Sequence, residues 1–274
     1  MHFHALTRIS MQNEKGAPMP TINLPQERKQ AILEELRLHG RVVAAELCNL
    51  YGVSEDTIRR DLRELAAAGL LKRVHGGALP ISPNNIPFME RDKQNPINKV
   101  MLARTARELV QDGQLILLGG GTTNTCIAKN LPPDLRATIV TISPQIALHL
   151  ASYQHIDVIL IGGHLNKKEL VASDAEAVAQ IKRFQADICF LGVCGLHPEV
   201  GCTIFDYEEV NIMRTFIEQS GDIIATVTAE KLGTVGPYIV SPISAISHII
   251  TEKQVEDEIL APYSALGIQV FKAD

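Results

Sequence analysis

Three arginines lie on the outward side of a predicted helix, where guanidinium groups could bind phosphates or the edges of guanine bases. They are Arg59, Arg60 and Arg63, and their helix begins after Ser54, a residue type that caps helix N-termini well. A solvated amphipathic helix is the plainer interpretation of such a charge run. The preceding glycine turn, the cap, the apolar spacing and the following basic hairpin together favour a DNA-binding helix. The residues expected to contact DNA are Ser54, Thr57, Arg59, Arg60, Arg63, Lys72, Arg73 and His75.

Glycine and small polar residues follow three predicted strands in the second part of the chain. Ligands bind at the carboxyl ends of parallel strands, and backbone N–H groups in such loops can hold a phosphate. Tight turns alone would explain one glycine-rich loop, but three in succession favour a ligand cleft. The first loop matches neither a dinucleotide-binding nor a Walker sequence, because Asn124 replaces the last glycine and no Gly-Lys-Ser/Thr follows. The candidate effector-binding residues are Gly119, Gly120, Gly121, Thr122, Thr123, Thr141, Ser143, Gly162 and Gly163.

Other reactive side chains give weaker signals. The carboxylates of Asp206, Glu208 and Glu209 could act as an acid–base pair, but favourable charge at a helix N-terminus explains them more simply. The histidines lack the spacing of metal ligands, and the five cysteines contain no Cys-x-x-Cys pair. We therefore expect no catalytic residue, no metal and no cofactor, and we expect thiols that stay reduced in the cytoplasm.

The elements that position these residues fall into two groups. Helices predicted at 25–38 and 42–51 precede the arginine-bearing helix, and a basic hairpin around Gly76 follows it, as in a winged helix-turn-helix. Further along, apolar strands alternate with helices, which predicts a mainly parallel α/β domain whose sheet is covered on both faces. The predicted strands are 114–118, 137–142, 156–161, 186–193, 222–227, 238–240, 246–250 and 268–271, and the predicted helices are 98–109, 122–130, 144–153, 174–184 and 207–220.

Composition and charge set the boundaries and exclude some classes of protein. We expect a disordered tail at 1–24, a winged helix-turn-helix domain at 25–79, a proline-containing linker at 80–96, and an effector-sensing and oligomerisation domain at 97–274.

The sequence contains no apolar run of about 18 residues, so it predicts no membrane span, and the first residues lack a secretory signal. The net charge is −5, and its acidic surplus lies beyond residue 80. Because a nearly neutral DNA module binds phosphates weakly, we expect a homo-oligomer on a double-stranded operator.

The sequence resembles the DeoR family of bacterial transcription regulators. The likeness rests on Val53-Ser54-x-x-Thr57-Ile58-Arg59-Arg60-Asp61-Leu62-x-x-Leu65, then Arg73-x-His75-Gly76-Gly77-Ala78, and continues through Arg91, Lys99, the Gly121-Thr122-Thr123 loop, Phe205-Asp206 and Lys231. The resemblance implies a second domain similar to ribose-5-phosphate isomerase and adds Lys231 to the effector-binding residues. It also implies a repressor of a carbohydrate operon that is released by a phosphorylated sugar or a related metabolite.

Five positions depart from the family pattern, and they are Gly119, Ile142, Asn166, Met213 and Thr228. The family usually has charged or polar side chains there, including an arginine and a lysine. Since each charge-assisted hydrogen bond contributes about 1.5–3 kcal/mol, we hypothesise that the effector is not a standard sugar phosphate. It could be less charged, or its phosphate could be held only by the glycine loop and Lys231. The alternatives are a sugar-phosphate isomerase-like enzyme with a vestigial helical domain, and a scaffold that only oligomerises. The outward arginines favour the regulator.

Overall fold

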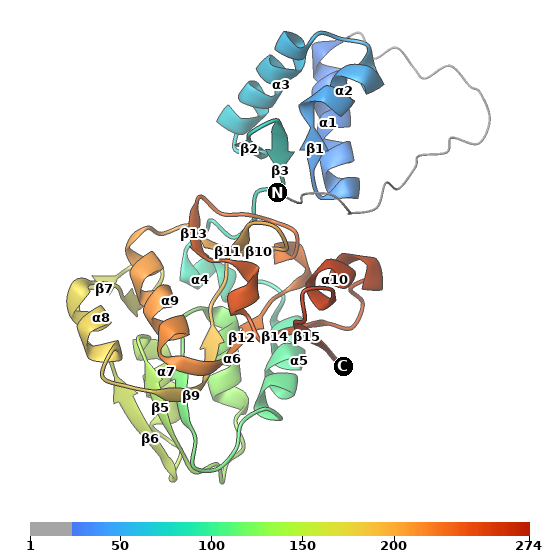
Figure 1. Ribbon diagram of the computed structural model, residues 1–274. Coiled ribbons are helices and arrows are strands. Elements are labelled where there is room, and N and C mark those ends of the chain that lie inside the picture. The colour runs from blue at the N-terminus through green and yellow to red at the C-terminus, as the bar shows by residue number, and fades with distance from the viewer. Residues whose placement is uncertain (1–23) are drawn as a thin grey trace, which may run out of the picture.

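The computed structural model describes residues 24–274, so the tail predicted at 1–24 lies outside the described residues apart from Leu24. Figure 1 shows a small unit built from the first helices and, below it, a larger α/β unit. The chain passes from one to the other directly after the strand that ends at Leu79.

The small unit is a winged helix-turn-helix. Its elements are α1 (Pro25–His39), β1 (Val42–Val43), α2 (Ala44–Tyr51), α3 (Glu55–Ala67), β2 (Lys72–Val74) and β3 (Gly77–Leu79). Gly40 and Gly52 end α1 and α2 in the left-handed conformation, with φ of 67° and 64°, where glycine is unstrained. The helix expected from residue 42 begins two residues later, because the β-branched pair Val42 and Val43 forms a strand against β3.

A buried ion pair joins α1 to α3. Arg28 Nε donates to Asp61 Oδ2 at 2.5 Å, and both residues are almost fully buried. Asp61 lies on the apolar side of α3, between Ile58 and Leu65. A lone charge in that position would be very unfavourable, and the pairing with Arg28 compensates for it. An aspartate at apolar helical spacing is a sequence signal for such a buried partner.

The larger unit contains a seven-stranded, fully parallel sheet, which confirms the predicted fold class. In spatial order its strands are β15 (Gln269–Ala273), β14 (His248–Glu252), β12 (Ser220–Thr226), β9 (Ala186–Leu191), β4 (Leu115–Leu118), β5 (Ala137–Thr141) and β6 (Ile156–Leu160). The interior strand β4 has the sequence Leu-Ile-Leu-Leu and is buried from Ile116 to Leu118. Such continuous apolar runs are typical of strands covered on both faces.

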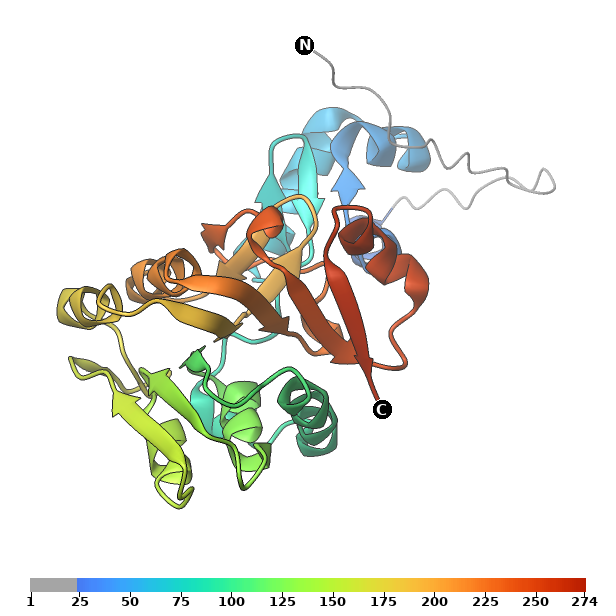
Figure 2. The same ribbon diagram turned by 60° about the horizontal axis from the view of Figure 1, so that its bottom comes forward.

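Helices pack on both faces of this sheet, as Figure 2 shows along its edge. One face carries α5 (Pro96–Arg107), α6 (Thr122–Asn130) and α7 (Pro144–Leu150), whose apolar residues form one core with Ile116 and Leu118. The other face carries α8 (Ala175–Ile181), α9 (Glu208–Glu218) and α10 (Asp257–Ser264), which share a core with Leu117. The alternation of strand side chains therefore separates two cores.

Several short elements were not expected from the sequence. They are α4 (Phe88–Arg91), β7 (Leu165–Asn166), β8 (Val171–Ala172), α10, and β10 (Gly195–His197) with β11 (Gly201–Ile204), which form a three-stranded antiparallel sheet with β13 (Tyr238–Ser241). Two 3-10 turns, η1 (Ala229–Lys231) and η2 (Ile243–Ala245), complete the chain. Apart from α10, which contains Pro262, these elements are too short for a hydrophobic period to be visible. Within residues 24–274 no helix has both the length and the apolar character needed to cross a membrane.

Candidate functional site

A groove runs between α3 and the wing formed by β2 and β3. Two of the predicted DNA contacts, Arg59 and Arg63, line it from α3, and Arg73 and His75 line it from the wing. All four side chains are exposed. In winged helix-turn-helix proteins the second helix of the pair enters the major groove, so these four groups would meet DNA together. Arg60 does not line this groove, and Lys72 lies exposed at the start of β2.

The predicted helix contacts differ in how the protein holds them. Arg59 donates to Glu55 at 2.7 Å and Arg60 to Glu64 at 3.0 Å, in exposed pairs one turn apart. Such pairs contribute only about 0.3–0.5 kcal/mol, so a phosphate or a base could replace the carboxylate. The Ser54 hydroxyl accepts a hydrogen bond from the backbone N–H of Thr57 at 3.3 Å and therefore serves as the helix cap.

Two glycines shape the wing for different reasons. Gly76 has φ of 78°, in the left-handed region where side chains are strained, and it forms the turn of the hairpin. Gly77 has no such φ but lies against β1, so that a Cβ atom there would be 1.9 Å from the carbonyl oxygen of Val42. Strand β3 of the wing can pair with β1 here only because residue 77 lacks a side chain.

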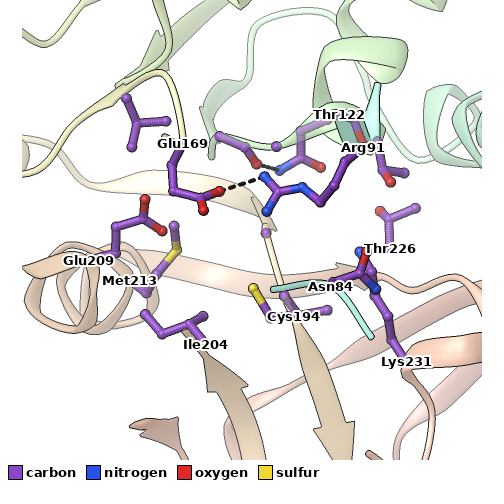
Figure 3. A pocket seen from close by; sticks show the side chains of 17 residues that line it. Asn84, Arg91, Thr122, Glu169, Cys194, Ile204, Glu209, Met213, Thr226 and Lys231 are labelled. Atoms are coloured by element: carbon purple, nitrogen blue, oxygen red, sulfur yellow. Dashed lines mark hydrogen bonds and ion pairs between the residues drawn. The ribbon is translucent and has the colours of Figure 1, made fainter. Parts of the chain in front are cut away.

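A second hollow, which we call the effector cavity because several predicted effector-binding residues line it, lies at the carboxyl ends of β4, β9 and β12, where ligands of parallel sheets are expected. Its wall comes from the loop after β4, the loop after β9, the turn between β7 and β8, helix α9, the η1 turn and the segment that follows the wing (Figure 3). The lining residues are Asn84, Arg91, Gly120, Gly121, Thr122, Thr123, Asn124, Glu169, Val171, Gly192, Val193, Cys194, Ile204, Glu209, Met213, Thr226 and Lys231.

The glycine loop after β4 presents the N-terminus of α6 to this cavity. Gly121, which precedes Thr122, offers no side-chain cap, so the first N–H groups of the helix are available to an anion. Asn124 holds the loop in place, because its amide donates to the carbonyl oxygens of Gly119, Gly120 and Phe190 at 3.0–3.2 Å. The asparagine that breaks the dinucleotide-binding pattern is thus the residue that fixes the loop.

Cationic groups lie near this loop. Arg91 and Lys231 line the cavity, and buried Lys99 donates to the backbone carbonyl of Arg91 from behind. Burial lowers the pKa of Lys231 and of Lys99, and nearby Arg91 lowers both further. An anion bound between them would relieve this repulsion, so the charges favour a phosphate or carboxylate ligand.

Acidic groups occupy the opposite side, as Figure 3 shows. Glu169 accepts a hydrogen bond from Arg91 at 2.5 Å in a buried ion pair. Glu209 lies beside them on α9, is 8% exposed, and has a buried Oε1 without a hydrogen-bond partner in the described chain. Burial raises the pKa of Glu209 to about 8, with smaller contributions from Glu169 and Asp206. Sequence reasoning placed Glu209 at a helix N-terminus but did not place it in a cavity.

The structure gathers some of the predicted effector residues and separates others. Gly120, Gly121, Thr122, Thr123 and Lys231 line the cavity, whereas Gly119, Thr141, Ser143, Gly162 and Gly163 do not. The β7–β8 hairpin accounts for part of the separation, because Ala172 N donates to Ile142 O at 2.9 Å, directly after β5. The hairpin therefore covers the end of β5, and the cavity lies at the ends of β4, β9 and β12.

The five departures from the family pattern are also dispersed. Met213 lines the cavity, but Gly119, Ile142, Asn166 and Thr228 are not part of its wall. Asn166 donates to Asp206 at 2.7 Å, and the Thr228 hydroxyl bonds Glu230 at 2.6 Å. Most of the substitutions thus leave the charges of the cavity unchanged.

The predicted linker packs directly on the larger unit and supplies part of the cavity wall. Ser82 N donates to Val235 O at 3.0 Å, Val235 N to Pro80 O at 2.9 Å, and Phe88 N to Lys168 O at 2.8 Å. The Ser82 hydroxyl donates to Cys194 O at 2.5 Å. The segment is therefore a structural bridge rather than a free spacer.

Comparisons with known proteins agree with both units. Residues 28–84 match the family model described as a DeoR-like helix-turn-helix domain, and residues 94–253 match the DeoR C-terminal sensor domain. The glycerol-3-phosphate regulon repressor of Escherichia coli (strain K12) is 31% identical over 227 residues, which cover 82% of this chain and 90% of that protein. The HTH-type transcriptional repressor GlcR of Bacillus subtilis (strain 168) is 31% identical over 230 residues, covering 83% and 88%.

Solved structures show more distant likeness. The sorbitol operon regulator SorC from Klebsiella pneumoniae has a TM-score of 0.42 at 10% identity, covering 87% of this chain and 98% of that one. Ribose 5-phosphate isomerase A from Methanocaldococcus jannaschii has a TM-score of 0.37 at 17% identity, covering 50% and 55%. The matched family models and the two repressors favour a transcription regulator over the isomerase-like enzyme. The chain belongs to the DeoR family of DNA-binding transcriptional regulators.

Proposed function

We propose that this regulator represses a carbohydrate-metabolism operon in the cytoplasm and releases its operator when a phosphorylated carbohydrate metabolite fills the effector cavity. The two relatives are named as repressors, and one of them as the repressor of a glycerol-3-phosphate regulon. Repression, carbohydrate metabolism and a phosphorylated effector come to this chain from that likeness together with the charges of the cavity.

The groove between α3 and the wing supports the DNA-binding part. Arg63, Arg73 and His75 are exposed there and make no side-chain hydrogen bond within the described chain, so they are free for phosphates and base edges. Arg59 can join them once it leaves its exposed pair with Glu55. Each DNA module still carries few net charges, which supports a homo-oligomer on the operator.

The anionic part of the effector fits the loop after β4. Backbone N–H groups at the start of α6 and the cations Arg91 and Lys231 face the same space. These groups keep the expectation of a phosphate open despite the departures from the family pattern. They favour a charged, anionic ligand over the less charged one that the sequence suggested.

The observation that carries the proposal is that Asn84 and Arg91, which follow the wing in the chain, line the effector cavity. Strand β3 ends at Leu79, and Ile81 already forms a parallel bridge with Val235, four residues after Lys231. A ligand that contacts Arg91 and Lys231 therefore acts on both sides of this bridge. Any change in the bridge is passed to the wing over two residues, which couples the cavity to the DNA-binding face.

The test is a mobility shift of the full chain on its own upstream intergenic DNA, with and without a panel of sugar phosphates and unphosphorylated sugars. We expect a specific shift that phosphorylated compounds release and their unphosphorylated forms do not. Arg63→Ala should weaken operator binding by about 1–3 kcal/mol, and Arg107→Ala, an exposed arginine of α5, is the matched control. A missing shift at low salt would refute DNA binding, and a shift indifferent to the panel would refute the effector class.

A further inference from the structure

One wall of the effector cavity holds a carboxyl group that the chain leaves without a partner. Glu209 is 8% exposed and its Oε1 is buried without a hydrogen bond in the described part of the chain. Buried polar atoms almost always have a partner, and each exception needs an explanation. Because Glu209 lines the cavity, its missing partner can come from a ligand.

The neighbouring groups cannot supply that partner. Glu169 is bound to Arg91, whose other terminal nitrogen donates to Ile86 O at 3.2 Å. Asp206 accepts hydrogen bonds from Asn166 at 2.7 Å and from the backbone N–H of Glu208 at 2.9 Å. One helical turn after Glu209, Met213 offers a thioether that has no proton to donate.

The charges around Glu209 favour a cation over a neutral donor. Burial raises the pKa of Glu209 most, Glu169 and Asp206 raise it further, and Arg91 and Lys168 lower it. A ligand hydroxyl would complete the hydrogen bond of the neutral carboxyl group only. A protonated amine would favour the ionised carboxylate and bind it through a charge-assisted hydrogen bond, which is about twice as strong as a neutral one.

The opposite side of the cavity carries groups that favour an anion. Lys231 and the N-terminus of α6 at Thr122 are suited to an anion, and Figure 3 shows Lys231 and Glu209 on opposite sides of the space. We propose that the effector is a phosphorylated amino sugar whose protonated amine binds Glu209 while its phosphate binds near Thr122 and Lys231. This inference rests on the proposed function, in which the cavity binds a phosphorylated carbohydrate.

The test compares matched ligands by isothermal titration with the full chain. The probes are glucosamine 6-phosphate and galactosamine 6-phosphate, their parent hexose 6-phosphates, and the N-acetylated forms, in which the amine has lost its charge. We expect at least one amino compound to bind ten times or more tightly than both its parent and its acetylated form. Equal or weaker binding of the amino compounds would overturn the proposal.

Two variants test whether a preference for the amino compound depends on Glu209. Glu209→Gln should bring the amino compound to within about threefold of its parent, while the parent still binds. Glu208→Gln, which removes an exposed carboxyl from the same turn, should keep the preference. A preference that survives Glu209→Gln would overturn the assignment. If phosphates bind and release DNA without preference for an amine, only this proposal fails; if no phosphorylated probe binds, the proposed effector class fails with it.

Discussion

Replacing Glu209 by glutamine removes a carboxyl group whose ionisation the fold opposes. Burial, Glu169 and Asp206 raise its pKa from the ordinary 4.5 to about 8, against the opposite effects of Arg91 and Lys168. Such a rise makes ionisation about 5 kcal/mol costlier in the folded chain than in the unfolded one. Below pH 4.5 the group is protonated in both states and folding bears no penalty. As pH rises toward 8 the unfolded state ionises alone, so the wild-type chain steadily loses stability.

The assay is the free energy of unfolding of the full chain, measured by urea denaturation with circular dichroism at several pH values. Between about pH 5.5 and pH 8.5, the stability of Glu209→Gln relative to wild type should grow by about 3 kcal/mol. Comparing the difference across pH cancels any fixed cost of burying an amide. Glu208→Gln controls for the loss of one negative charge. A Glu209→Gln difference that stays constant with pH, or an equal growth in the control, would refute the argument.

Three further predictions concern the winged helix and its bridge. Asp61→Ala should cost about 3–5 kcal/mol of DNA-domain stability by leaving Arg28 buried and unpaired, and a double variant with Arg28→Met should recover much of it in the same denaturation assay. Gly77→Ala should lower operator affinity at least about tenfold, since its Cβ would be 1.9 Å from Val42 O, and an unchanged mobility shift would contradict this. Asn84→Ala should bind the operator normally but need more effector for release, which a titrated mobility shift measures.

The sequence predicts the sheet and the winged helix well because each rests on local patterns. Strand β4 is four consecutive apolar residues, and α6 begins at Thr122 after the glycine loop, as expected. Helix α10 was missed because Pro262 lies inside it, a residue that usually argues against a helix. Its stability comes from packing, since Leu260 and Tyr263 are buried in the core. Packing of this kind leaves no local pattern to find.

The effector cavity could be predicted only in part, for a topological reason. Strand ends show which edge of the sheet binds ligands, but they do not show which part of that edge stays open. The β7–β8 hairpin contributes to this by bonding to Ile142 and covering the end of β5 at Thr141. Likewise, Arg91 and Glu169 form a buried pair across 78 residues of sequence, which no spacing rule could reveal.

The free energy needed to couple the cavity to operator binding can be compared with the free energy of a few hydrogen bonds in the cavity. A hundredfold change in operator affinity requires about 2.7 kcal/mol of differential binding. One or two charge-assisted hydrogen bonds contribute that much, at about 1.5–3 kcal/mol each. Arg91 already divides its donors between Glu169 and Ile86 O, so a phosphate competing for them would free the segment that follows the wing. Under the proposed function the regulator needs no large motion in its sensor domain, because Asn84 and Arg91, which line the cavity, belong to the segment that follows the wing.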